Sequence, residues 1–142
     1  MFLFDINIYI YAHREDIPEH NKYKEYLENI LSSNETSGYS TLALSGFLRI
    51  VTHPKIFSLP TDLKTAINFT KCITERQNSI PINPGPKHWK IFLELCEKSS
   101  AKGNLIPDAF FAALSIESGC VWLTTDRDYS RFDNLNCKHP FE

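Results

Sequence analysis

Residues 120–128, CVWLTTDRD, begin with an apolar run that gives way at once to hydroxyls and acids. A short unbroken apolar run is typical of a strand that is buried on both faces, as in a parallel sheet. The N-terminus repeats this arrangement, because residues 1–4 are apolar and Asp5 follows them directly. Two buried strands that each lead into an acid predict an α/β fold around a short parallel sheet.

The segments between these two runs alternate between helical and extended patterns. Apolar residues at helical spacing predict helices over residues 8–12, 18–33, 41–52, 61–78, from 87 to before 103, and from 107 to 118. Shorter strands are predicted at 38–40 and 80–83. The helix from Pro107 is apolar almost all round, so we expect it to be central. Asn7 is a candidate cap of the first helix, and Trp89 is expected to lie in the core.

Length and composition limit the possible classes of protein. With 142 residues, 42% of them hydrophobic, the chain is long enough for one domain, residues 1–142, whose core needs no disulfide. No apolar run approaches the roughly 20 residues that cross a membrane, and the early Asp5 argues against a signal peptide. We therefore expect a cytoplasmic protein with no membrane contact. The four cysteines form no CxxC pair and are expected to be core thiols, and the histidines lack zinc-ligand spacing.

The net charge of −2, from 15 basic and 17 acidic residues, excludes a polybasic surface that would bind nucleic acid without specificity. Any contact with nucleic acid must therefore be local.

The informative feature is the position of three acids. Asp5 and Asp126 follow the two buried strands, and Asp108 lies in the first turn of the central helix. The carboxyl ends of parallel strands form the edge at which ligands bind. Each acid alone has an ordinary explanation, as a turn former or as a helix-start residue. Together they are expected to converge on one pocket.

Such a cluster requires a counter-charge. Two like charges about 4 Å apart repel by about 4 kcal/mol at an effective dielectric constant of 20. Oxygen-only ligation by aspartates suits Mg²⁺, with Mn²⁺ as a substitute. An ion of this kind usually activates a water and stabilises the leaving oxygen of a displacement at phosphorus. The leading hypothesis is hydrolysis of a phosphodiester.

Four blocks of the sequence carry a family resemblance. The segments DIN at residues 5–7, FLRIVTHP at 47–54, NLIPDA at 104–109 and TDRDY at 125–129 resemble, in order and spacing, the signature blocks of PIN-domain ribonucleases. The likeness is greatest to the VapC toxins of toxin–antitoxin pairs and covers nearly the whole chain. The resemblance implies a three-layer α/β/α sandwich and Mg²⁺- or Mn²⁺-dependent cleavage of single-stranded RNA.

The resemblance also implies partners, namely a VapB-like antitoxin that covers the site and a second copy of the chain in a homodimer. Tyr23, Tyr26 and Phe69 lie on predicted helices that have more apolar residues than one buried face requires. This surplus supports a partner surface only indirectly.

Residue by residue, the resemblance places metal binding and catalysis at Asp5, Asp108 and Asp126. Asp128 matches a further acid that acts through a water.

Other residues match positions that orient the acids or contact RNA. Asn7 and Thr125 match polar residues beside the acids, although a helix cap and a strand-end hydroxyl explain them at least as well. Arg49 is the best candidate for an RNA phosphate contact, with pairing to a buried carboxylate as an equal alternative. Arg14 is a weaker candidate, and Arg127 is expected to soften the repulsion between its two neighbouring acids.

One position departs from the family pattern. Gly46 stands where most of the family has a glutamate, and glycine has no side chain to bind a metal. We expect one well-bound ion, joined at most by a second that arrives with the RNA phosphate. The alternative function is a catalytically weak or silent PIN-like RNA-binding protein.

Two other classes with acids at strand ends fit less well. A haloacid-dehalogenase-type phosphatase would have a second aspartate where this chain has Asn7. A response-regulator receiver would need an aspartate on a middle strand, and residues 80–83 contain none.

Overall fold

The computed structural model describes all 142 residues and contains six α-helices and five short strands. The strands are β1 (Phe2–Phe4), β2 (Ser37–Tyr39), β3 (Ser79–Pro81), β4 (Val121–Leu123) and β5 (Cys137–Lys138). The helices are α1 (Ile6–His13), α2 (His20–Ser32), α3 (Thr41–Val51), α4 (Leu63–Thr74), α5 (His88–Ser99) and α6 (Leu105–Ser118). A short 3-10 helix, η1 (Arg127–Arg131), follows β4. None of the helices is long and apolar enough to span a bilayer.

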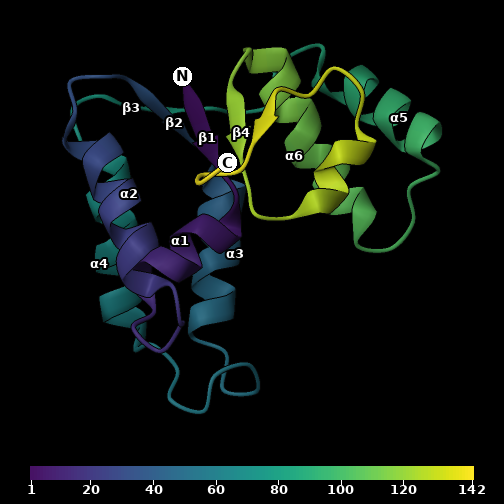
Figure 1. Ribbon diagram of the computed structural model, residues 1–142. Coiled ribbons are helices and arrows are strands. Elements are labelled where there is room, and N and C mark those ends of the chain that lie inside the picture. The colour runs from purple at the N-terminus through teal and green to yellow at the C-terminus, as the bar shows by residue number, and fades with distance from the viewer.

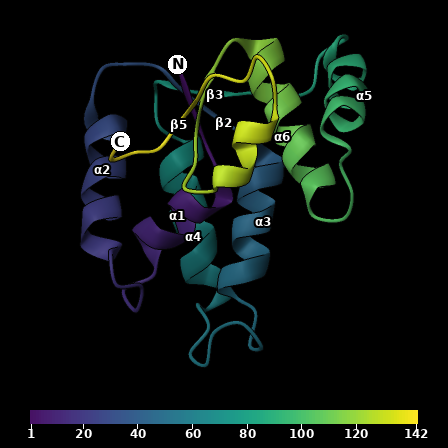
Figure 2. The same ribbon diagram turned by 45° about the vertical axis from the view of Figure 1, so that its right-hand side comes forward.

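All strand pairs are parallel, as the sequence predicts. β4 pairs with β1 on one side and with β5 on the other, and β2 pairs with β3. β2 lies next to β1 (Figure 1), where a Cβ on Gly38 would come within 3.1 Å of Leu3 Cδ2. This close approach explains the glycine in β2. The helices fall in two groups, α1–α4 on one side of the strands and α5–α6 on the other (Figures 1 and 2). The predicted α/β/α class is confirmed.

The core is built around β4 and α6. Trp122 is fully buried, and its ring stacks on Phe111 at 5.4 Å between centroids and contacts Tyr129 at 5.5 Å. Phe111 and its neighbours 112–115 on α6 are all buried, so the helix is central as predicted. This packing fixes the start of α6 against the end of β4, which is where the acids lie.

Several local predictions are wrong. Asp5, not Asn7, caps α1. Trp89 is 63% exposed, because α5 turns His88 and Phe92 inward instead. α6 begins at Leu105, two residues before Pro107, since the first helical residues have no intrahelical N–H bond for a proline to break.

Other differences concern the ends of elements and the surface. α4 ends at Thr74 rather than near residue 78, and Cys72 is an exposed thiol, not a core one. Tyr23 and Tyr26 both pack on Phe141. The apolar surplus on α2 is thus used inside the chain.

Candidate active site at the strand ends

Asp5 lies at the junction of β1 and α1 and is only 7% exposed. Its backbone N–H donates to the Leu123 carbonyl at 2.9 Å, which ties the end of β1 to the end of β4. Its side chain caps α1, because Oδ1 accepts from the Ile6 N–H at 2.7 Å. The carboxylate is therefore held at the carboxyl edge of the sheet by the strand before it and the helix after it.

Thr124 connects two of the acids. Its buried hydroxyl donates to Asp5 Oδ2 at 2.5 Å and accepts from the Asp126 N–H at 3.0 Å. Thr125, the hydroxyl named from the sequence, makes no side-chain hydrogen bond within the chain, and neither does Asn7. Thr124 directly follows β4, and that place at the strand end is the signal that could have identified it.

Asp108 approaches the same edge from the first turn of α6 and is half-buried. The hydroxyl of Tyr129, a buried residue of η1, donates to Asp108 Oδ1 at 3.4 Å. No sequence pattern indicates this contact, since it depends on how η1 folds back over Trp122.

Burial and the negative charges of neighbouring carboxylates raise the pKa values of Asp5 and Asp108. Burial is the main cause that raises the pKa of Asp5 to about 6, and the charges of Asp108 and Asp126 also raise it. The hydrogen bonds from Thr124 and the Ile6 N–H act in the opposite direction and lower this pKa. Burial and then the charge of Asp126 raise the pKa of Asp108 to about 6. Burial and these same acids raise the pKa of Tyr129, so its hydroxyl stays protonated and remains a donor. The repulsion expected from the sequence is present.

Asp128 lies at the periphery of this cluster. Its side chain is 60% exposed, and its carboxylate is 4.0 Å from Arg131 Nε. Its backbone N–H donates to Asp126 Oδ1 at 2.8 Å, so its main chain helps to orient Asp126. Its charge contributes to the raised pKa of Asp108.

The oxygen ligands at this edge are of the kind that a hard divalent cation prefers. No three acidic, histidine or cysteine side chains are already arranged close enough to bind one, however. Asp5, Asp108 and Asp126 offer only carboxylate oxygens, each with lone pairs left after the hydrogen bonds above. A cation would relieve the repulsion that raises the pKa values of Asp5 and Asp108. We infer that the three carboxylates fit such an ion and would draw together around it.

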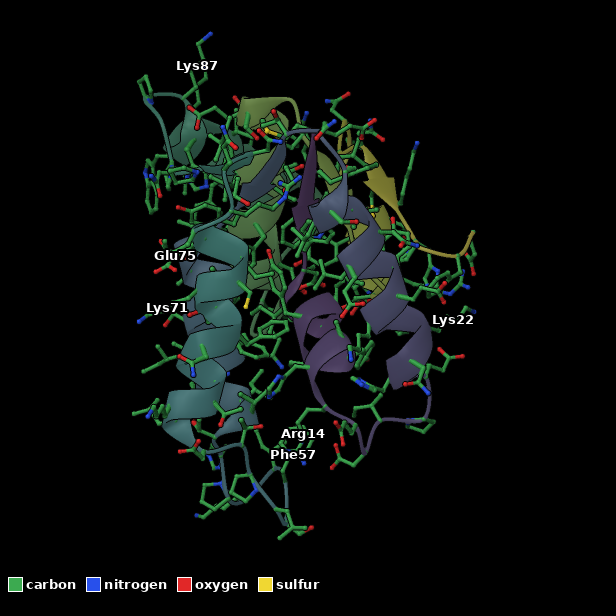
Figure 3. All side chains as sticks on the ribbon, turned by 90° about the vertical axis from the view of Figure 1, so that its left-hand side faces the viewer. Arg14, Lys22, Phe57, Lys71, Glu75 and Lys87 are labelled. Carbon is green, nitrogen blue, oxygen red and sulfur yellow. The ribbon has the colours of Figure 1, made fainter.

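The three arginines considered for RNA contact differ in whether their side chains are already paired within the chain. Arg49 is exposed on α3 and forms no ion pair, which leaves it free for a phosphate. Arg14 is buried instead, because it pairs with Asp16 at 2.6 Å and its guanidinium lies 4.0 Å from the centroid of the Phe57 ring (Figure 3). Arg127 pairs with Glu142 at 2.9 Å rather than with the acids beside it.

Gly46 contacts Ile6, the residue after Asp5. A Cβ on Gly46 would lie 2.6 Å from Ile6 Cδ1, closer than carbon atoms can approach. Ile6 therefore fills the space into which a side chain at position 46 would first extend.

Gly46→Glu is accordingly expected to lower the free energy of unfolding by about 1 kcal/mol, the low end of the cost of overpacking, because only the end of the Ile6 side chain must shift. Ile6→Val removes the atom in the way, so the double variant should recover most of this loss and, unlike Gly46→Glu alone, bind Mn²⁺ more tightly than the parent. Urea denaturation and a Mn²⁺ titration measure the two effects. Equal losses in both backgrounds would show that Ile6 is not the obstacle.

The fold and these acids agree with a known domain. The PIN domain model matches residues 2–135. Solved structures with the same fold include VapBC2 from Rickettsia felis bound to a promoter DNA fragment, with a TM-score of 0.68 and 20% identity over 97% of both chains. Another is VapBC-1 from nontypeable Haemophilus influenzae, with a TM-score of 0.68 and 18% identity over 99% of this chain and 98% of the other. These establish the class as that of PIN domains.

Relatives that are similar in sequence indicate which group of PIN domains the chain resembles most. The VapC ribonuclease Mb2897 of Mycobacterium bovis is 34% identical over 142 residues, which is all of this chain and 97% of the relative. Ribonuclease VapC31 of Mycobacterium tuberculosis is 34% identical over 140 residues, 99% of each chain. The chain belongs to the PIN-domain family and, within it, to the VapC group.

Proposed function

We propose that the chain is a Mg²⁺-dependent endoribonuclease and the toxin of a toxin–antitoxin pair. The observation that carries the proposal is the convergence of Asp5, Asp108 and Asp126 at one sheet edge, with the pKa values of Asp5 and Asp108 raised. The full-length similarity to proteins named as VapC ribonucleases supports RNA as the substrate.

In this proposal Asp5, Asp108 and Asp126 hold the metal ion. When bound, Mg²⁺ supplies an activated water and stabilises the charge on the leaving oxygen. Thr124 bonds both the Asp5 carboxylate and the Asp126 backbone, so it holds these two residues at the same strand end. Tyr129 orients Asp108 in the same way. Arg49 provides a positive group for a phosphate of the incoming strand.

The test is cleavage of single-stranded oligoribonucleotides by the purified chain. Cleavage is expected with Mg²⁺ or Mn²⁺, none with EDTA, and products should carry 5′-phosphate ends, because a water attacks the phosphorus. Mass spectrometry of the products distinguishes the ends. Products with 2′,3′-cyclic phosphates would exclude this mechanism, since the ribose hydroxyl would then be the nucleophile.

A second candidate function is RNA binding without cleavage, which the Gly46–Ile6 contact favours because it leaves only three acids at the centre of the site. RNA binding that survives EDTA, with no cleavage under any metal condition, would support this alternative and contradict the first proposal.

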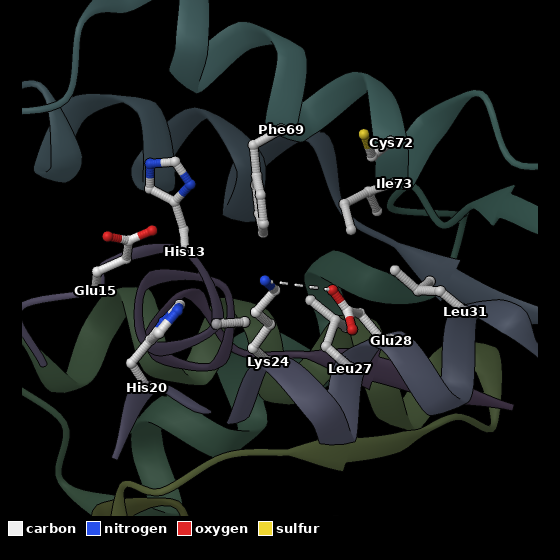
Figure 4. Close-up of a pocket in the computed structure, with 11 residues that line it drawn as sticks. His13, Glu15, His20, Lys24, Leu27, Glu28, Leu31, Phe69, Cys72 and Ile73 are labelled. Carbon is white, nitrogen blue, oxygen red and sulfur yellow. Dashed lines mark ion pairs between the residues drawn. The ribbon is translucent and has the colours of Figure 1, made fainter. Parts of the chain in front are cut away.

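We further propose that an antitoxin segment occupies the groove between α1, α2 and α4 (Figure 4). The groove measures about 360 Å³ and has an apolar floor that includes Leu27, Phe69 and Ile73. Lys24 and Glu28, 3.9 Å apart, lie at its rim. Relief of growth arrest on co-expression of a neighbouring reading frame, lost when Lys24, whose side chain is exposed, is replaced by glutamate, tests this partner.

For the expected homodimer, Trp89 and Leu93 form an exposed apolar stripe one turn long on α5. We propose this stripe as part of the contact between two copies. Light scattering should give twice the chain mass, and the monomer mass after Trp89→Glu. A monomer without any substitution would contradict the proposal.

A further inference from the structure

A hollow of about 410 Å³ lies between the β4–η1 turn and β5, and we name it the β5 recess. Its volume falls within the roughly 300–1,000 Å³ of pockets that hold small organic groups. Asp126 and Thr124 both line it, so it shares a wall with the acid cluster. It also lies beside the carboxyl ends of β4 and β5, the edge at which parallel sheets bind ligands.

The lining combines apolar side chains with free hydrogen-bonding groups. Leu135 and Cys137 are among the hydrophobic residues that line it. Thr125 and Ser130, which also line the recess, have hydroxyls with no hydrogen bond inside the chain. His139 Nδ1 accepts from the Phe141 N–H at 3.2 Å, so in the neutral ring Nε2 carries the proton and is a free donor. Donors and acceptors beside apolar side chains suit a flat heteroaromatic ring with polar edges.

The rim provides an exchangeable positive charge. Arg127 and Glu142 both line the recess and form an ion pair at 2.9 Å, with their side chains 84% and 57% exposed. Exposed ion pairs of this kind contribute little to stability. Arg127 can therefore leave Glu142 for a phosphate at small cost.

These features point to single-stranded RNA. A strand with one phosphate at the acids must place the neighbouring nucleotide close by, and Asp126 lies in the wall of the recess. Bases of unpaired RNA are recognised by hydrogen bonds to their edges and by apolar or aromatic contact with their faces.

We propose that the β5 recess binds the nucleobase next to the scissile phosphate and so determines which nucleotide adjoins the cut. The inference rests on the proposed ribonuclease function and extends it to specificity.

The first test compares cut sites in a randomised single-stranded RNA pool. The parent chain should prefer particular nucleotides at one position beside the cut. His139→Ala should reduce this preference by about 3–10-fold, the effect of one hydrogen bond, and Leu135→Trp should remove it by filling the recess. Ser58→Ala, at an exposed loop residue outside the recess, is the control. An unchanged preference in both recess variants would overturn the proposal and leave the ribonuclease function intact.

The second test needs no cleavage. Cys137 lines the recess, whereas Cys72 is an exposed thiol on α4 and serves as an internal control. Oligoribonucleotides bound to the Asp108→Asn variant should slow alkylation of Cys137 and leave Cys72 unaffected, as measured by mass spectrometry. Protection by the antitoxin but not by RNA would make the recess a protein-binding site and overturn the inference. If the parent chain cuts no RNA but RNA still protects Cys137, the base site stands and the ribonuclease function fails.

Discussion

Asp108→Asn is expected to lower the rate of RNA cleavage by more than about 100-fold while the fold stays intact. A loss of about 10–100-fold is typical when a residue that only orients a metal ligand is removed, and Asp108 is proposed to be a ligand itself. Asparagine keeps the shape and can still accept from the Tyr129 hydroxyl, so the loss would reflect the missing charge. Asp5→Asn and Asp126→Asn should behave alike. Single-turnover cleavage of one oligoribonucleotide with saturating Mg²⁺ measures the effect.

Two aspartates outside the centre of the site provide graded controls. Asp133→Asn changes an exposed carboxylate with no ion pair and should leave the rate unchanged. Asp128→Asn should cost less than any of the three central substitutions, because its carboxylate is exposed and close to Arg131. A rate for Asp108→Asn within about tenfold of the parent would remove Asp108 from the proposed metal ligands.

The sequence predicts the elements that apolar periodicity specifies. The two buried strands, the central α6 and the position of Asp5 directly after β1 all follow from runs of apolar residues. The sequence does not predict β5 and η1, since two strand residues and one turn of 3-10 helix carry no periodic signal. Residues of both elements line the β5 recess, and so the sequence does not predict the recess either.

In the candidate site, too, some features follow from the sequence and others depend on the folded structure. That acids follow the strands is a property of the chain order, so their convergence could be predicted. Which hydroxyl contacts them depends on a single rotamer, and Thr124 rather than Thr125 fills that role. Arg14 illustrates the limit for charged residues, because its pairing with Asp16 and its contact with Phe57 require a loop conformation that no local pattern specifies.

The raised pKa of Asp5 gives the second large effect, a pH-dependent stability of the metal-free chain. Its pKa is about 6 in the folded state and 3.8 as a free residue, so between these values the folded chain binds more protons than the unfolded chain. Stability due to Asp5 therefore falls as the pH rises from about 4 to about 6. About two pKa units correspond to roughly 3 kcal/mol.

Asp5→Asn removes the titrating carboxyl, so the difference between the two chains reports Asp5 together with its coupling to Asp108 and Asp126. In EDTA, the free energy of unfolding of Asp5→Asn minus that of the parent should increase from about pH 4 to about pH 6 and then level off. Urea denaturation followed by circular dichroism measures the difference at each pH, with Asp133→Asn as the control. A difference that does not change with pH would mean that Asp5 is not destabilised by its surroundings. At neutral pH, Mg²⁺ should stabilise the parent more than the variant, since the ion offsets the same buried charge that asparagine removes.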